Sequence, residues 1–474
     1  MFISKTSALL DPLRQRLLSR PKGYPLVGQL PQALADPLHT IVQAALSRPG
    51  EIATVRLGPA TIYLVSEPEQ VQEILSDSGR RFAKGGSMWE PLRRLFGSGL
   101  VTADGEEWLR NRRVMQPIFV SRHITVLGDL VLQVVEETAA RLQPYAERGA
   151  KIDLGAEMML LTQQTLVRAL FGASGLPGKA ESVGAAILEA FRILSTRLFV
   201  YFLPKWVPLP GDTVLERAIR TIDEGVFWLL SERRNDPADH SDLLSLLLAA
   251  RDNETQTGMT DRQLRDELVV LLVAGNETTA HTMSWLWYLL DQHPEVARRL
   301  RAELDEVLGD RAPTVADLPK LNYMKMVLQE TLRLYPPGWI LPRAAKEDVT
   351  LGGRSIPKGS TVLVCTYATH HDPRWWDNPE HFDPERFAPE AVARRSRYTY
   401  YPFGGGPRQC IGMQFALLEA QLITAILARR FRFRLSPGHP VAPGVATTLK
   451  PRHGMQMYIS LPQPESNARV AMRG

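Results

Sequence analysis

The spacing of apolar residues changes twice along the chain. Two short segments, residues 52–57 and 61–65, have alternating or continuous apolar character and predict β-strands, and Gly58-Pro59 between them predicts a hairpin turn. From about residue 68 to residue 336 the pattern is helical, with Pro and Gly marking the turns. Strand patterns return at residues 349–351, 361–365 and 455–461. The pattern predicts a mainly α protein with a minor β region, in which a large helical lobe joins a small β-rich lobe made from both ends of the chain.

One predicted helix is unusually long. Thr260 and Gln263 have the spacing of a capping box, and the helical pattern continues to Gln292, a length of about 45 Å at 1.5 Å per residue. Residues 268–274 are apolar on every face, which predicts a helix centre that is buried throughout. A polar segment, residues 276–279, follows directly. Because buried polar groups cost free energy unless they are paired, this segment needs a partner network or a function.

Composition and charge exclude several classes of protein. The 474 residues are 44% hydrophobic and 23% charged, as in ordinary globular proteins, and the net charge of +5 is dispersed without long runs, so we expect no nucleic-acid partner. Two cysteines cannot build a disulfide framework, which favours a reducing compartment and a cytoplasmic location. No segment approaches the roughly 20 apolar residues of a membrane span, so we expect no transmembrane anchor.

We predict three parts of unequal length and a monomeric state. Residues 1–20 form an amphipathic leader, residues 21–462 a single globular domain, and residues 463–474 a polar tail. The leader is expected to pack on the protein's own surface, with peripheral membrane contact as the alternative.

A glycine-rich loop, residues 403–412, ends in a cysteine. Its glycines let the backbone approach a flat ligand closely. A helical pattern begins just after Cys410, and a position at a helix N-terminus lowers the pKa of a thiol and favours the thiolate. A thiolate is the axial ligand that promotes O–O cleavage on heme iron. The loop alone is equally compatible with a buried structural cysteine, because free cysteines are commonly small core residues.

The loop resembles the heme-binding signature of the cytochrome P-450 family, Phe-x-x-Gly-x-Arg-x-Cys-x-Gly, at every fixed position. The resemblance implies the cytochrome P-450 fold, with heme b buried between the long helix and this loop. It implies Cys410 as the proximal iron ligand, Phe403 packing near the sulfur, and Arg408 paired with a heme propionate. Gly404 and Gly412 are included among the cofactor-binding residues.

In the sequence before the cysteine loop, Glu330 and Arg333 stand at i and i+3 on one helical face and suit an ion pair. The same spacing recurs elsewhere in the chain, where ordinary surface pairs are expected. By its position before Cys410, this pair resembles the family's Glu-x-x-Arg motif. The resemblance implies that Arg386 joins it in a buried network bracing the cysteine loop. The three residues are therefore structural rather than catalytic, and such a network is costly to break from one side.

The segment Ala274 to Thr279 of the long helix reads Ala-Gly-Asn-Glu-Thr-Thr. Gly275 lowers helix stability and permits a local opening, and Ala274 and Thr278 share one face. A tolerated glycine beside solvated polar residues is the alternative, which the apolar residues just before it disfavour. The segment resembles the family's oxygen-activation motif. That resemblance implies that Ala274 makes room beside the cofactor and that Glu277 and Thr278 relay protons to iron-bound dioxygen.

Further cofactor contacts follow from the same resemblance. Trp108 and Arg112, at i and i+4, resemble the propionate-binding pair, and Arg343 occupies the place of another propionate arginine. Many relatives carry His where this chain has Asn111, which leaves Asn111 without a role. The expected substrate contacts lie in apolar or aromatic segments that suit a lipophilic ligand, although each is equally compatible with the core: Met88, Trp89, Phe199, Trp339, Ile340 and Thr448.

The resemblance implies a heme-thiolate monooxygenase. Such an enzyme uses dioxygen to hydroxylate or epoxidise a lipophilic small molecule, here a fatty acid, terpenoid or polyketide, with electrons from a separate ferredoxin or flavodoxin and its reductase. We expect an arginine group to dock an acidic partner: Arg110, Arg113, Arg394, Arg395 and Arg397. The alternatives are a peroxide-using or rearranging heme-thiolate enzyme and a non-catalytic heme sensor or carrier. The Glu277–Thr278 pair favours the monooxygenase.

Overall fold

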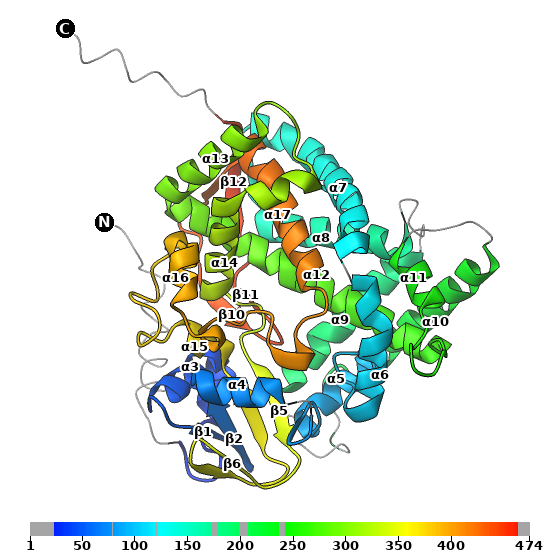
Figure 1. The fold of residues 1–474 in the computed structure, drawn as a ribbon, viewed down its shortest axis with the longest axis vertical. Coiled ribbons are helices and arrows are strands. Elements are labelled where there is room, and N and C mark those ends of the chain that lie inside the picture. Colours follow the sequence, from blue (N-terminus) through cyan, green and yellow to red (C-terminus); the bar gives the residue numbers. More distant parts are fainter. Residues whose placement is uncertain are drawn as a thin grey trace.

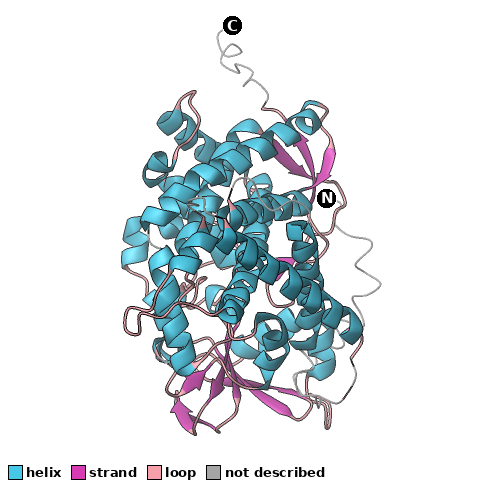
Figure 2. Cartoon of the chain, turned by 90° about the vertical axis from the view of Figure 1, so that its right-hand side faces the viewer, coloured by secondary structure: helices cyan, strands magenta, loops and turns pink. Residues whose placement is uncertain are grey.

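The computed structural model describes residues 23–77, 79–119, 121–172, 179–198, 207, 209–236 and 242–462. The predicted leader, the polar tail and Phe199 lie outside these ranges. Helices make up most of the described chain (Figures 1 and 2). The helices are α2 Leu30–Ala35, α3 Pro37–Leu46, α4 Pro68–Ser76, α5 Glu90–Phe96, α6 Gly105–Met115, α7 Ser121–Glu147, α8 Leu154–Phe171, α9 Lys179–Arg197, α10 Asp212–Asn235, α11 Leu243–Ala249, α12 Asp261–Gln292, α13 Pro294–Leu308, α14 Asn322–Leu334, α15 Thr366–His370, α16 Pro389–Ala393 and α17 Met413–Arg430.

A five-stranded sheet in the described chain has the order β1-β2-β8-β5-β3. Its strands are β1 Ala53–Leu57, β2 Ala60–Val65, β3 Phe82–Ala83, β5 Leu341–Ala345 and β8 Thr361–Val364. The predicted hairpin is confirmed, because β1 and β2 pair antiparallel across Gly58-Pro59 with Leu57 opposite Ala60. Strand β8 adds to β2 in parallel, which places a segment from late in the chain beside one from its beginning.

The predicted C-terminal strand exists but does not join this sheet. Strand β12 Gln456–Ser460 pairs with β9 Arg432–Leu435 and β4 Lys151–Asp153. Figure 1 shows β12 at the end of the molecule opposite to β1 and β2. The expectation of one β-rich lobe built from both chain ends is therefore wrong in this respect. The partner strands are too short to stand out in the sequence, so the pairing depended on the tertiary fold. Two small hairpins complete the strands: β6 Val349–Leu351 with β7 Arg354–Ile356, and β10 Pro443–Val445 with β11 Leu449–Pro451.

Helix α12 runs through the centre of the helical lobe (Figure 1), with contacts to α8, α14 and α17. Its predicted capping box is confirmed, since the Thr260 hydroxyl accepts from the Gln263 N–H and the Gln263 side chain accepts from the Thr260 N–H. The predicted burial on every face is wrong at Ala274, which is exposed to an internal cavity.

The predicted local opening at Gly275 is absent, because α12 continues as one helix from Asp261 to Gln292. A side chain at Gly275 would instead place its Cβ 3.1 Å from Leu166 of α8. The glycine therefore serves the close packing of α12 against α8.

Among the described residues, no single helix has the length and apolar character needed to cross a bilayer. One bent pair of segments, Gly105–Phe119 and Ile124–Glu147, passes the same test by length and composition alone.

Candidate functional site

The cysteine loop is held in a compact, hydrogen-bonded form before α17 begins at Met413. The Cys410 N–H donates to the Phe403 carbonyl at 2.9 Å, and the Gln409 N–H donates to the Gly406 carbonyl at 3.1 Å. Gly406 has φ of 64°, and a Cβ there would lie 2.0 Å from the Leu75 carbonyl oxygen. Only glycine fits this position, because it tolerates both the left-handed backbone and the close approach of α4.

The Cys410 side chain opens into an internal cavity of about 390 Å³. Burial raises the pKa of the Cys410 thiol, and the Gly412 N–H and the charges of Arg112 and Lys84 lower it by less. The helix N-terminus lowers this pKa through the Gly412 N–H, as predicted, but the net shift in the polypeptide alone is upward. The physical reason is that desolvation outweighs the local positive field.

Cationic side chains gather on the wall of this cavity. The lining includes Lys84, Arg112, Arg343 and Arg408, and most of the remaining lining residues are apolar. Arg112 donates to the Gln409 carbonyl at 3.0 Å, and Lys84 donates to the Val101 carbonyl at 3.2 Å. Arg343 is 6% exposed, so its charge is directed into the protein. The cavity thus combines one thiol, apolar walls and a cluster of four basic side chains.

Arg408 is only partly neutralised. It forms an ion pair with Asp104, donates to the Ala103 carbonyl at 3.0 Å, and lies 4.2 Å over the ring of Trp108. Its buried Nε has no hydrogen-bond partner among the described residues. A buried donor of this kind costs free energy, which a carboxylate ligand in the cavity would recover.

Lys84 and Asp104 are members of this site that the sequence reasoning missed. Burial, followed by the charges of Arg343 and Arg408, lowers the pKa of Lys84 well below its ordinary value. Lys84 follows the two-residue strand β3, and Asp104 precedes α6, so neither belongs to a recognisable motif. Only the tertiary structure brings them together.

On the opposite wall, α12 presents the predicted acid and alcohol. The Thr278 hydroxyl donates to the Ala274 carbonyl at 2.8 Å. Glu277 accepts from the Thr448 hydroxyl at 2.9 Å and lies 3.6 Å from His281. Burial raises the pKa of Glu277, but His281, Thr448 and Lys450 outweigh it, so the pKa lies below its usual value. Glu277 is therefore ionised near neutral pH.

A second cavity, of about 220 Å³, adjoins the first and shares Lys84, Ala274, Thr278 and Arg343 with it. The predicted substrate contacts Met88, Trp89, Ile340 and Thr448 all line it.

Trp339 does not line this cavity. Its side chain is fully buried, and its indole N–H points to the Ala446 carbonyl at 3.4 Å. The prediction that Trp339 contacts substrate is therefore wrong, because the residue packs in the core beside the cavity.

The three residues of the expected bracing network lie together. Arg333 and Glu330 form two hydrogen bonds of 2.7 and 2.8 Å with both side chains fully buried, and Arg386 lies 3.3 Å from Glu330. Arg333 also donates to the His370 carbonyl at 2.8 Å, and the ring of His370 accepts from the Tyr401 N–H at 3.0 Å. Tyr401 stands just before Phe403, so the network reaches the start of the cysteine loop.

Asn111 has a structural partner rather than a cofactor contact. Its amide donates to Glu267 of α12 and to the Ser98 carbonyl, each at 3.1 Å. Glu267 is fully buried, and burial raises its pKa to about 8. Asn111 thus ties α6 to α12.

The predicted arginine docking group is only partly free. Arg113 pairs with Asp252 and Glu254, and Arg395 stacks 4.2 Å over Trp376. Arg110 donates to the Gly258 carbonyl at 2.8 Å. Three of its members thus have partners within the protein, whereas Arg394 and Arg397 are exposed. Docking of an acidic partner by this group stays a prediction.

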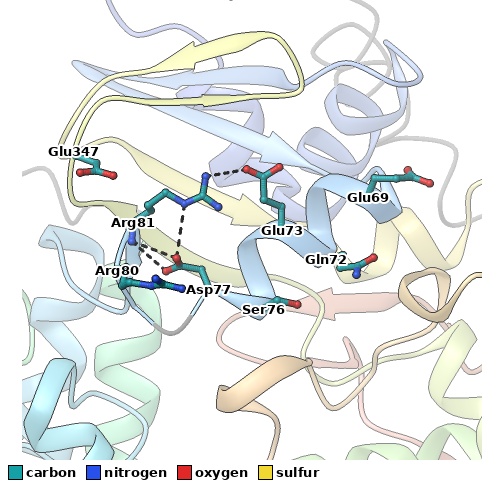
Figure 3. Close-up of a pocket in the computed structure, with 8 residues that line it drawn as sticks. All are labelled: Glu69, Gln72, Glu73, Ser76, Asp77, Arg80, Arg81 and Glu347. Carbon is teal, nitrogen blue, oxygen red and sulfur yellow. Dashed lines mark hydrogen bonds and ion pairs between the residues drawn. The ribbon is translucent and has the colours of Figure 1, made fainter.

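A further hollow, of about 700 Å³, lies on the surface beside α4 (Figure 3). Its charged side chains pair with one another: Arg81 donates to Glu73 at 2.9 Å, and Asp77 accepts from the Arg81 N–H at 3.1 Å. The hollow is polar and does not include Cys410. We assign the chemistry to the internal cavities.

Glu419 of α17 is a buried carboxyl between the site and the rest of the core. Burial raises its pKa to about 8, and the neighbouring hydroxyls of Thr279 and Thr165 offset this rise only in part. The folded protein thus retains a proton that the unfolded chain loses. Between the ordinary pKa of a glutamate and pH 8, stability should fall by about 1.4 kcal/mol per pH unit from this group.

We therefore expect Glu419→Gln to flatten the decline in stability between pH 5 and pH 8. Denaturant unfolding at a series of pH values measures this, with the exposed Glu390→Gln as the control. An unchanged pH dependence in Glu419→Gln would show that the carboxyl ionises normally.

Comparisons with known proteins agree with this geometry. The family model described as Cytochrome P450 matches residues 18–457. Cyclooctat-9-en-7-ol 5-monooxygenase from Streptomyces melanosporofaciens is 37% identical over 423 residues, covering 88% of this chain and 90% of the relative. Pentalenene oxygenase from Streptomyces avermitilis is 32% identical over 433 residues, covering 91% and 95%. The crystal structure of the cytochrome P450DA heme domain superimposes with a TM-score of 0.82 at 28% identity, covering 94% of this chain and 97% of that one.

The chain belongs to the cytochrome P450 family. It is a monooxygenase with the mainly helical P450 fold, and the family implies a heme cofactor. The residues present fit such a group, since a single thiol, apolar walls and buried cations with an unpaired donor suit an apolar macrocycle with carboxylate substituents.

Proposed function

We propose that this enzyme inserts one oxygen atom of dioxygen into a terpenoid. The single observation that carries the proposal is the apolar cavity of about 220 Å³ that adjoins the Cys410 cavity. Relatives named for cyclooctat-9-en-7-ol and pentalenene support a terpenoid over a fatty acid or polyketide. We place the reaction in secondary metabolism.

The cofactor in this proposal is heme b. Cys410 would hold the iron, and Arg112, Arg343 and Arg408 would hold the propionates with Trp108 packed against Arg408. When bound, the heme supplies oxygen activation at a thiolate-ligated iron. Phe403, Gly404 and Gly412 would shape the loop, and Ala274 would leave room on the α12 side.

Glu277 and Thr278 act in this proposal as the proton relay. Glu277 is ionised, so it can take up a proton and pass it toward the cavity. The Thr278 hydroxyl donates to the Ala274 carbonyl at rest and must rotate to donate into the cavity. This relay favours the monooxygenase over an enzyme that uses peroxide or rearranges its substrate, and over a sensor or carrier, since these need no proton delivery.

We expect Thr278→Ala to keep consuming reducing equivalents while forming about a hundredfold to ten-thousandfold less product, because general acid catalysis contributes on the order of 10²–10⁴ in rate. The measurement is the ratio of oxidised terpenoid to electrons consumed, with released hydrogen peroxide as the complement. Ser284→Ala, further along α12, is the matched control, because its hydroxyl donates to the Ala280 carbonyl four residues back at 2.8 Å in the same way. Fully coupled turnover in Thr278→Ala would refute the relay.

Electrons come in this proposal from a separate ferredoxin or flavodoxin with its reductase. The exposed Arg394 and Arg397 are the members of the predicted arginine group that offer free charge to an acidic partner. We further propose that the enzyme is monomeric and cytoplasmic.

A further inference from the structure

The turn between β10 and β11 forms one wall of the second cavity. Its residues Ala446, Thr447 and Thr448 all line the cavity. Each threonine hydroxyl reaches a different helix: Thr447 lies 2.8 Å from Ser195 of α9, and Thr448 lies 2.9 Å from Glu277 of α12. We call Glu277, Thr447 and Thr448 the acceptor cluster, because these side chains can accept hydrogen bonds from a ligand.

Both threonine hydroxyls already donate hydrogen bonds to groups within the protein. The Ser195 hydroxyl donates to the Phe191 carbonyl at 2.7 Å. Since each hydroxyl has one proton, the 2.8 Å contact between Ser195 and Thr447 requires Thr447 to be the donor. The Thr448 hydroxyl likewise donates its proton in the hydrogen bond to Glu277. The side chains of the cluster therefore offer a ligand only lone pairs.

Glu277 is a third hydrogen-bond acceptor in this cluster. Its lowered pKa leaves the resting carboxylate ionised, so between proton transfers it accepts hydrogen bonds and does not donate them. The donors of the second cavity come from other elements: Lys84 and Arg343 lie on the wall shared with the Cys410 cavity, and the buried indole N–H of Trp89 has no partner among the described residues. The acceptor cluster lines the second cavity and not the Cys410 cavity. A ligand in the second cavity meets acceptors at the β10–β11 turn.

We infer that the second cavity selects a terpenoid that already carries a hydroxyl group and binds that group as a donor to Glu277, Thr447 and Thr448. The inference rests on the proposed function and narrows its substrate class to a terpene alcohol. Against an unsubstituted hydrocarbon, the lone pairs of the cluster that no protein donor uses would lose hydration without compensation, which disfavours that ligand. The step that supplies the substrate must therefore install a hydroxyl, by an earlier oxygenation or by a cyclisation that ends in capture of water.

Binding of matched probes to the heme-loaded enzyme tests this inference. The first set of probes is the sesquiterpene alcohol cedrol, its methyl ether and the parent hydrocarbon cedrane. The second set is a tricyclic diterpene alcohol, its methyl ether and its parent hydrocarbon. Calorimetric titration should show the alcohol binding about tenfold tighter than the ether, a difference of about 1.4 kcal/mol, because only the alcohol can donate a hydrogen bond to the cluster. Equal affinities within a set would overturn the inference and leave the proposed function intact. Binding of no probe would overturn the terpenoid assignment as well.

Variants of the cluster separate recognition from packing. Glu277→Gln adds an N–H donor, so the preference for alcohol over ether should fall severalfold while cedrane binds as before. Thr447→Val should weaken only alcohol binding, Thr447→Ser should restore it, and Thr221→Val on the exposed face of α10 is the control. If Thr447→Val weakened the binding of alcohol and hydrocarbon equally, Thr447 would be a packing residue and the inference would fail for it.

Discussion

Cys410→Ser is expected to lose product formation down to background and to lose the red-shifted Soret band that a thiolate ligand gives the ferrous–carbon monoxide complex. A serine hydroxyl at this position is neutral and cannot replace the electron-donating sulfur. The loop should keep its shape, since the Cys410 N–H bonds to the Phe403 carbonyl through backbone atoms alone. The measurements are the spectrum of the reduced, carbon monoxide-treated protein and the yield of oxidised terpenoid.

The chain offers a matched control in its other cysteine. Cys365 is buried beyond the end of β8, and its thiol points to the Leu363 carbonyl at 3.4 Å. Cys365→Ala should therefore retain both the spectrum and the activity. A histidine-type spectrum in the unmodified protein would contradict the assignment of Cys410 as the ligand. Loss of the thiolate spectrum in Cys365→Ala but not in Cys410→Ser would contradict it as well.

Glu330→Gln is expected to lower the free energy of unfolding by about 3–5 kcal/mol, since it leaves Arg333 as a buried charge without its partner. Both side chains are fully buried, and Arg386 loses its contact with the same carboxylate. Because Arg333 connects through His370 to Tyr401, the variant should also weaken heme retention. Denaturant unfolding and the rate of heme transfer to an acceptor protein measure the two effects.

Glu90→Gln provides the comparison at the same sequence spacing. Glu90 and Arg93 are also i and i+3, 3.3 Å apart, but their side chains are 42% and 36% exposed. Removing this pair should cost no more than about 1 kcal/mol, because water already screens it. Equal losses in the two variants would mean that burial does not set the value of the Glu330–Arg333 pair.

The features that the sequence predicted correctly are those encoded by neighbouring residues. The capping box at Thr260, the β1–β2 hairpin and the extent of α12 each depend on a few consecutive side chains and on backbone geometry. The cysteine loop belongs to the same class, because Gly406 and Cys410 lie within one short segment and their spacing is visible directly.

Contacts between distant segments were decided only by the tertiary structure. The pairing of Arg408 with Asp104, the approach of Lys84 to the cavity, and the bond from Thr448 to Glu277 join residues that no local pattern connects. Burial followed the same rule: Ala274 faces a cavity although its helix segment looked uniformly buried, and Trp339 is core although its segment suited a ligand. The thiol of Cys410 illustrates the division most clearly. Its place in the loop is local, but its raised pKa is set by desolvation, a property of everything folded around it.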